Sequence, residues 1–283
     1  MADAPFGPFP VYCLDHAAAE ADGRMSRARH TRVSWRLDNM ISRLLDLTGL
    51  SRDAIAGPRT GLISGSQYGC AQVYEMHMRL RRNGPRGVDP VSFAQATHNY
   101  PVSAAAIEYG IEGPCLAAVS FESAGLDALQ IAVDWLNAGR CDRVLVAAYE
   151  DLASPIADHL AARARDMPGT AYGEAMVLLL LERERAAVAR GHHGLPVLTR
   201  VAPVRMPCGV GLRVFAEQAT RPSTLAPRPL DYLAAGGLLA LHDLLSRAEG
   251  GVHAGEQWQI AARGSAGAGI AASVTIRQAE MAQ

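Results

Sequence analysis

The 283-residue sequence contains no lysine, so all 27 of its basic residues are arginines. These arginines are scattered along the chain, and together with 28 acidic residues they give a formal net charge of −1. A chain without a concentrated basic patch lacks the electrostatic footprint of nucleic-acid or anionic-membrane binding. Aromatic residues make up only 6% of the chain, which leaves little material for stacking on bases. We therefore predict no nucleic-acid partner and no membrane partner.

Cysteine usage and the apolar runs indicate a cytoplasmic protein. The five cysteines are an odd number, are widely spaced and include no C-x-x-C pair, so neither a disulfide framework nor a zinc site is expected. Residues 1–11 contain Asp3 and three prolines and lack the basic-then-apolar order of a signal peptide. The longest apolar run, Ala175–Leu181, is far too short to cross a bilayer. No metal and no cofactor are expected.

Short apolar runs alternate with helical stretches, which is the pattern of a layered α/β fold. Strands are predicted at Gly61–Ser66, Leu116–Ser120, Arg143–Tyr149, Ala175–Leu181, Trp258–Ala262 and Ile270–Ile276. Helices are predicted at about Ala71–Arg82, Glu122–Asn137, Ser154–Arg165 and Leu230–Arg247, and within Asp89–Tyr109 after a loop. Val201–Leu230 holds five of the 16 prolines and is expected to be mostly connection.

Four motifs between Gly61 and about Arg190 carry a family resemblance. They are the glycine-rich turn Gly61–Gly69, the stretch Ala96–Pro114, the segment Gly113–Leu126, and Tyr172–Ala175 before the fourth strand. In this order they resemble the N-terminal half of β-ketoacyl synthases, which are members of the thiolase fold. The resemblance implies a thiolase-like layered α-β-α fold in a single domain, 1–283. Its N-terminal half would cover about 1–190, and a truncated C-terminal half about 191–283.

The segment Gly113–Leu126 departs from the family at the position that matters for catalysis. In active members a cysteine nucleophile stands at the start of the helix, where backbone N–H groups and the macrodipole stabilise the thiolate. Counting from either end of the segment puts Glu122 at that position. An acyl-glutamate would be an anhydride rather than a thioester, so acyl transfer through Glu122 is not expected. We interpret Glu122 as a first-turn acid that suits the dipole, and Ser120 as the helix cap.

The resemblance also implies two catalytic histidines from the C-terminal half, one in an H-G-T-G-T-like loop and one opening a late helix. The sequence has no such loop, and the second histidine position falls at about Leu230–Asp231. His242 lies three turns further on and is interpreted as an ordinary residue of that helix. At Gly264–Gly269 no βαβ unit follows, so a dinucleotide loop is excluded. Nucleophile and both histidines are absent together, and we expect no condensation by this chain alone.

Other conspicuous residues have structural interpretations. His192-His193 is expected to lie in a solvated loop, because adjacent residues in a turn rarely converge on one metal ion. Cys115 and Cys141 are interpreted as small buried residues. The alternating charges of Glu182–Arg190 are typical of a solvated helix face.

The leading functional hypothesis is a non-catalytic subunit similar to a chain length factor. The resemblance is to truncated ketosynthase-like proteins of type II polyketide systems, of the kind that make aryl-polyene-like chains. It implies a heterodimer with a full-length ketosynthase, with an acyl carrier protein reached through that complex. Candidate acyl-pocket residues are Phe93, Gln95, Thr97, His98, Tyr100, Phe121 and Glu122. Bulk at Phe93, Tyr100 or Phe121 would set the depth of the pocket and so limit product length. For His98 a structural role stays open beside the pocket role.

Two alternatives to the leading hypothesis stay open. One is a decarboxylase or acyltransferase that acts on a malonyl- or acyl-carrier protein, although Glu122 would repel a malonyl carboxylate. The other is a homodimeric scaffold that binds the carrier protein without an active partner.

Overall fold

The computed structural model describes residues 9–17, 30–166, 171–191, 197–205, 212–216, 230–249, 257–263 and 268–275. Its strands are β1 (Phe9–Ala17), β2 (Thr60–Ser66), β3 (Cys115–Val119), β4 (Arg143–Glu150), β5 (Ala175–Glu182), β6 (Val197–Arg205), β7 (Leu212–Ala216), β8 (Gln257–Arg263) and β9 (Ala268–Thr275). The α-helices are α1 (Arg32–Thr48), α2 (Arg52–Ile55), α3 (Ala71–Asn83), α4 (Pro90–Gln95), α5 (Tyr100–Tyr109), α6 (Ala124–Asn137), α7 (Ile156–Asp166), α8 (Glu184–Ala189) and α9 (Gly236–Glu249). Two 3₁₀ turns, η1 (Pro85–Gly87) and η2 (Leu233–Ala235), join helices.

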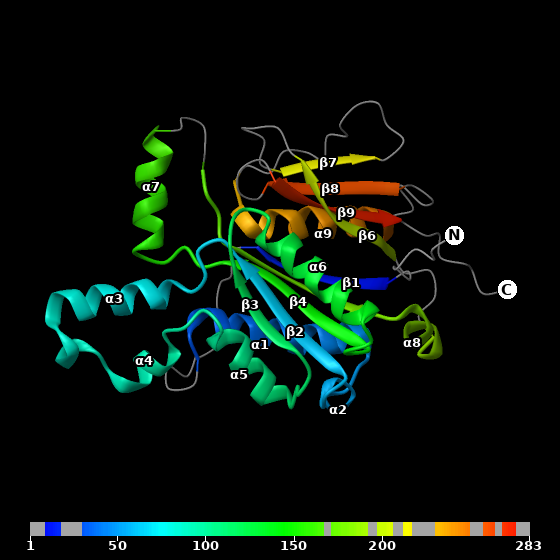
Figure 1. Ribbon diagram of the computed structural model, residues 1–283, viewed down its shortest axis with the longest axis horizontal. Coiled ribbons are helices and arrows are strands. Elements are labelled where there is room, and N and C mark those ends of the chain that lie inside the picture. Colours follow the sequence, from blue (N-terminus) through cyan, green and yellow to red (C-terminus); the bar gives the residue numbers. More distant parts are fainter. Residues whose placement is uncertain are drawn as a thin grey trace.

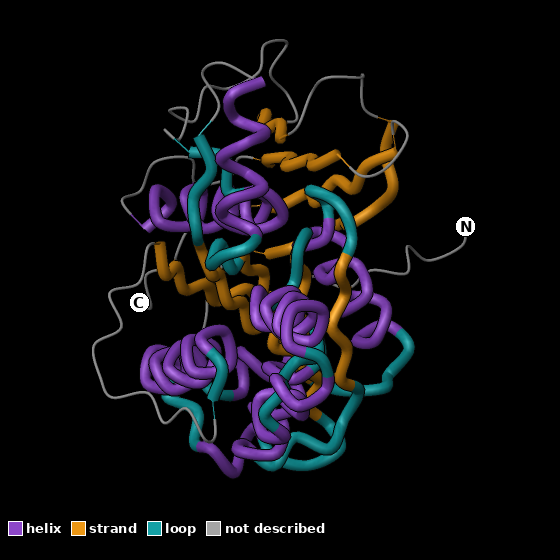
Figure 2. The backbone as a smooth tube through the Cα atoms, turned by 90° about the vertical axis from the view of Figure 1, so that its left-hand side faces the viewer, coloured by secondary structure: helices purple, strands orange, loops and turns teal. Residues whose placement is uncertain are grey.

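The strands form a nine-stranded sheet in the order β3-β2-β4-β5-β1-β6-β9-β8-β7. β2 pairs in parallel with both β3 and β4, whereas β5 pairs antiparallel with β4 and with β1. Helices α6 and α9 lie between the β3–β5 part of the sheet and the β6–β9 part, and α1 and α5 cover the opposite face of the first part (Figure 1). Seen from the side, the helical layer that contains α1 and α5 lies beneath the strands (Figure 2).

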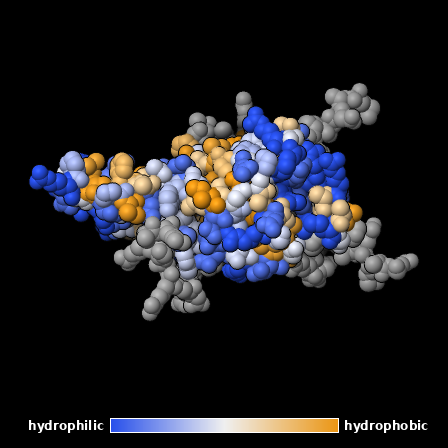
Figure 3. Space-filling view, turned by 90° about the horizontal axis from the view of Figure 1, so that it is seen from below, coloured by the Kyte–Doolittle hydropathy of each residue, from blue (hydrophilic) through white to orange (hydrophobic). Residues whose placement is uncertain are grey.

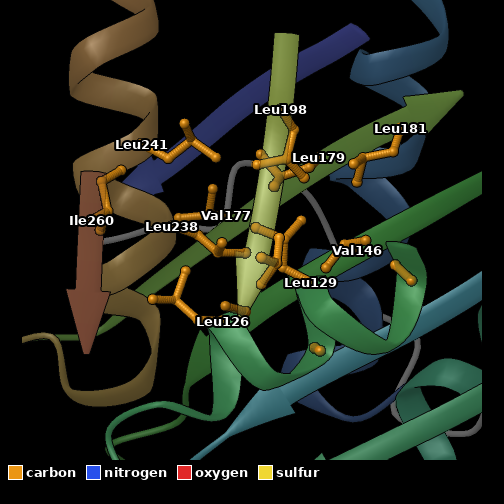
Figure 4. Close-up of a cluster of buried hydrophobic side chains, with 14 of the residues drawn as sticks. Leu126, Leu129, Val146, Val177, Leu179, Leu181, Leu198, Leu238, Leu241 and Ile260 are labelled. Atoms are coloured by element: carbon orange, nitrogen blue, oxygen red, sulfur yellow. The ribbon is translucent and has the colours of Figure 1, made fainter. Parts of the chain in front are cut away.

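The central strands β4 and β5 are buried on both faces, which explains their continuous apolar sequences. Successive side chains of a strand point to opposite faces. In β5 one set, including Val177 and Leu179, therefore packs against α6 and α9, and the alternate set, including Leu178, packs against α1 and α5. Figure 4 shows the first of these clusters, where Leu126 and Leu129 of α6 meet residues of β4, β5, β6, α9 and β8.

The predicted strands and helices of residues 61–182 are confirmed with small shifts at their ends, with two exceptions. Asp89–Tyr109 contains two helices rather than one, because Asp89 accepts from the N–H groups of Val91 and Ser92 and starts α4. The second exception is the start of α6, at Ala124 rather than Glu122. Within the described part of the chain, no helix is both long and apolar enough to span a membrane.

Two other predictions were wrong, and two fall outside the described residues. Val201–Leu230 is not only connection, because β6 continues to Arg205 and β7 occupies Leu212–Ala216, paired with distant β9 and β8. Glu182 does not lie on a solvated face: it ends β5, is fully buried, and pairs with Arg190 of the α8 C-cap. His192-His193 and residues 264–267 lie outside the described residues.

Candidate functional site

The elbow, which we define as Ser120–Ser123 between β3 and α6, is the centre of the candidate site. The Ser120 N–H donates to the Ser66 carbonyl at the end of β2 (3.1 Å). Ser123 is the N-cap residue but makes no capping bond through its side chain. Instead the hydroxyls of Ser123 and Ser120 donate to the Asp127 carboxylate, at 2.8 and 3.2 Å. The predictions that Ser120 caps the helix and that Glu122 lies in its first turn were therefore wrong.

Two glycines allow the backbone to approach closely at the elbow. A Cβ at Gly65 of β2 would lie 2.1 Å from the carbonyl oxygen of Ala124. A Cβ at Gly125 would lie 2.4 Å from the carbonyl oxygen of Ala234 in η2. These contacts hold the N-terminus of α6 against β2 on one side and η2 on the other. Glu122, at the predicted nucleophile position, is half-buried and precedes the first helical residue by two positions.

The charge of Glu122 in the elbow acts on polar side chains of α7 and of the loop before β5. The rings of Tyr68, just after β2, and His159 of α7 lie edge to face with centroids 6.0 Å apart. Burial alone would lower the pKa of Arg163 of α7, but Tyr172, Tyr68 and the charge of Glu122 together raise it. Sequence reasoning missed these residues. The i, i+4 spacing of His159 and Arg163 on one helix was the available signal.

A network of partly buried charged side chains is centred on Asp151 and Glu174. The Nε of Arg32, at the start of α1, donates to Asp151 just after β4 (2.9 Å), and its guanidinium also pairs with Glu174. Arg36 pairs with the same Glu174 carboxylate at 3.1 Å. The second carboxylate oxygen of Asp151 accepts from the N–H of Ala71, the first residue of α3 (2.8 Å). The network thus ties α1, α3, β4 and the entry to β5 together.

Three described cysteine side chains are not activated nucleophiles. Burial raises the pKa of Cys70 to about 12 and that of Cys141 to about 11. Burial also raises the pKa of the Cys115 thiol. Cys141 is buried as predicted, whereas Cys115 is exposed, because β3 is an edge strand and leaves that side chain uncovered. None of the three thiols is held as the thiolate that acyl transfer needs.

The predicted pocket residues fall into two groups. Gln95 is buried and its amide nitrogen donates to the hydroxyl of half-buried Tyr100 (3.3 Å). His98 is half-buried, and its Nδ1 accepts the Cys70 N–H at 3.3 Å. Phe93, Thr97 and Phe121 are exposed, with Phe93 at 65% and Phe121 at 54% of their full accessibility.

Several large apolar side chains are exposed on the same elements, and we call them together the apolar face. It consists of five large side chains from α4, α5, the edge strand β3 and the elbow: Phe93, Ile107 (83% exposed), Leu116, Val119 and Phe121. α4 belongs to the excursion, residues 71–95, which projects from the body (Figure 1). Seen from below, apolar side chains gather both on the excursion and on the adjoining body (Figure 3). Clusters of exposed apolar side chains often mark a binding site. Among the described residues no group of three or more potential ligands could hold a metal ion.

Comparisons with known proteins identify the family. The family model for the N-terminal domain of β-ketoacyl synthase matches residues 24–187. Spectinabilin polyketide synthase system protein NorA' of Streptomyces orinoci is 30% identical over 169 residues, which are 54% of this chain and 4% of the relative. Polyketide synthase GfsB of Streptomyces halstedii is 29% identical over 53% of the chain and 3% of its own length. The chain thus spans only a small part of these relatives.

Solved structures agree on the fold. One is a type II polyketide synthase acyl-carrier protein in complex with its ketosynthase (AntDE:AntF), with a TM-score of 0.71 and 17% identity, covering 88% of this chain and 83% of that one. Another is the ishigamide ketosynthase/chain length factor, with a TM-score of 0.60 and 16% identity over 89% and 83%. The layered sheet, the elbow between β3 and α6 and these matches lead to one conclusion: the chain belongs to the β-ketoacyl synthase family and has its thiolase-like fold.

Proposed function

We propose that this protein is a non-catalytic subunit that pairs with a full-length ketosynthase and limits the length of the acyl chain which that partner builds. The observation that carries the proposal is the exposed apolar face beside an elbow whose nucleophile position holds Glu122. A partner that covers this face would remove the apolar surface from water, which favours association by about 25 cal/mol per Å². The family of the chain, and the ketosynthase complexes among the solved structures that it resembles, support a ketosynthase as the partner.

The edge strand β3 strengthens this proposal. Its sequence, Cys115-Leu116-Ala117-Ala118-Val119, carries no charge and no proline. Natural proteins usually protect a free strand edge with such residues, since an unprotected edge invites pairing with another chain. Ile107 on the neighbouring helix α5 extends the same apolar surface. A large apolar seam of this kind suits a stable interface.

The proposed pocket role rests on the side chains that lie exposed outside the core. Phe93 and Phe121 are exposed and are free to enter a partner's tunnel, whereas Gln95 and Tyr100 are engaged with each other. We therefore propose Phe93 and Phe121 as the residues that limit product length. Tyr100, the first residue of α5, would support them through its hydrogen bond with Gln95. The carrier protein would reach the chain through the complex, in an aryl-polyene-like or related type II system.

Co-expression with a full-length ketosynthase tests the pairing. The proposal expects a stable 1:1 complex in size-exclusion chromatography, which Ile107→Asp disrupts. Val188→Asp is the matched control, because Val188 is also exposed (43%) but lies on α8, away from the apolar face. A homodimer that does not bind the ketosynthase would instead support the alternative of a homodimeric scaffold. Equal effects of the two aspartate variants would contradict the assigned surface.

Product analysis tests the control of chain length. In a reconstituted system Phe93→Ala and Tyr100→Ala should lengthen the products, the first more than the second. Val91→Ala is the control, since Val91 is an exposed apolar residue (48%) of the same helix α4. An unchanged product profile for both pocket variants would contradict the proposal.

A further inference from the structure

The His98 ring, between α4 and α5, packs against the segment that leads into α3, which lies well before it in the sequence. On one side it packs on Gly69, where a Cβ would lie 2.1 Å from the His98 Nδ1. Gly69 also has a φ of +70°, so glycine is required there by both conformation and space. On the other side the ring lies 6.0 Å from that of Tyr74, measured between centroids. His98 therefore joins the turn after β2 to the stretch between α4 and α5.

The same contact supplies a cap for α3. Cys70 is the N-cap residue of α3 and makes no capping bond through its side chain. Its own N–H donates to the Nδ1 of His98 (3.3 Å), and the next N–H, that of Ala71, donates to Asp151. Both acceptors come from outside the helix. They fix the direction in which α3 and the rest of the excursion leave the body.

We propose that neutral His98 is a positioning residue, which holds the excursion and its exposed Phe93 in the orientation that the partner ketosynthase binds. The inference rests on the proposed function, and it changes the role of His98 from a pocket wall to a support. The bond to Cys70 requires the imidazole tautomer that carries its proton on Nε2, since Nδ1 is the acceptor. A protonated ring has no acceptor, and its charge is unfavourable at a helix N-terminus.

The titratable groups near His98 give the support of the excursion a simple dependence on pH. Tyr74 and His77 of α3 act on the ring itself, and the start of α3 adds the Cys70 thiol, bonded to Tyr149 of β4, and Asp151, which accepts the Ala71 N–H. Of these groups, only the histidines belong to the residue type that ordinarily titrates near neutrality. Burial, and to a lesser degree the charge of His77, lower the pKa of His98. The support is therefore complete above the ordinary histidine pKa of about 6.5 and is lost as the pH falls through the lower folded value.

The test compares His98→Asn, His98→Leu and the control His77→Gln. The asparagine amide oxygen can replace the Nδ1 acceptor but does not titrate, whereas leucine removes the acceptor. Affinity for the ketosynthase is measured by titration at several pH values between 4.5 and 7.5, a range that extends well below the ordinary histidine pKa of about 6.5. For the wild type and His77→Gln we expect affinity to fall about fivefold at the acid end, the effect of one ordinary hydrogen bond. His98→Asn should stay tight throughout, and His98→Leu should be weak throughout.

Three results would overturn the inference. They are a wild-type affinity that does not change with pH, an asparagine variant as weak as the leucine variant, or a His77→Gln variant that abolishes the pH dependence. If no complex forms even at pH 7.5, the proposed function fails separately. The ¹⁵N resonances of the His98 imidazole in the isolated chain then decide the inference. An unprotonated Nδ1 at pH 7.5 whose titration shifts the Cys70 amide supports the positioning contact, and a protonated Nδ1 overturns it.

Discussion

Replacing Glu150 with glutamine should make the protein more stable, and the gain should depend on pH. Glu150 ends β4 directly beneath the elbow and is 1% exposed. One carboxyl oxygen accepts from the N–H groups of Gln67 (2.7 Å) and Ala234 (3.2 Å), and the other contacts the Ser66 hydroxyl (3.3 Å). Burial nevertheless raises the pKa of Glu150 to about 8, from an ordinary value of 4.5.

The magnitude follows from proton linkage. Because the folded pKa is raised, the stability associated with this group is complete below the ordinary pKa and is lost as the pH rises through the folded value. At pH 7 the unfolded chain is ionised at Glu150 and the folded chain is mostly protonated, so folding takes up a proton at a cost of about 3 kcal/mol. Glutamine avoids this cost. Its oxygen can accept the same two N–H groups, and its nitrogen can donate to the Ser66 hydroxyl.

The assay is urea unfolding, followed by tryptophan fluorescence, at pH values from 5 to 9. The free energy of unfolding of Glu150→Gln should exceed that of the wild type by a margin that grows by about 1.4 kcal/mol per pH unit between pH 5 and 8. Above pH 8 the margin should level off. Glu112→Gln, an exposed glutamate before β3, is the control and should show no such trend. A glutamine variant less stable than the wild type at every pH would refute the reasoning, because it would mean that the ionised carboxylate is the form which its N–H donors stabilise.

Two further substitutions test the packing around the site. Glu182→Ala should lower the free energy of unfolding by about 3–5 kcal/mol, because it leaves Arg190 and Arg143 partly buried without their shared carboxylate; urea unfolding measures this, and a loss below about 1 kcal/mol would contradict it. Gly125→Ala should destabilise the fold by more than about 2 kcal/mol, because its Cβ would meet the backbone oxygen of Ala234. Thermal unfolding checks that effect, and an unchanged midpoint would show that η2 can move away from α6 freely.

The sequence by itself determined the central elements and the family. β4 and β5 are buried on both faces, so their sequences are continuous apolar runs. Such runs predict a buried strand even when the partner strands are unknown. Glu122 and Gly125 are positions of one local motif, Gly113–Leu126. The spacing of these positions can be read from the sequence without knowledge of the tertiary contacts around them. For this reason the absence of a cysteine at the elbow could be inferred before any tertiary structure was known.

Only the tertiary structure decided which side chains face outwards and which charges meet. β6 and β7 pair with strands far along the chain, so a proline-containing segment became sheet where local signals indicated connection. Arg32 and Glu174 lie 142 residues apart in sequence, and no local pattern predicts their contact. Likewise Phe93 and Gln95 are two residues apart on α4, yet one is exposed and the other buried, because a short helix presents different faces to the body. Whether Cys115 is covered depends on β3 being the edge of the sheet, which is a property of strand order rather than of the strand's own sequence.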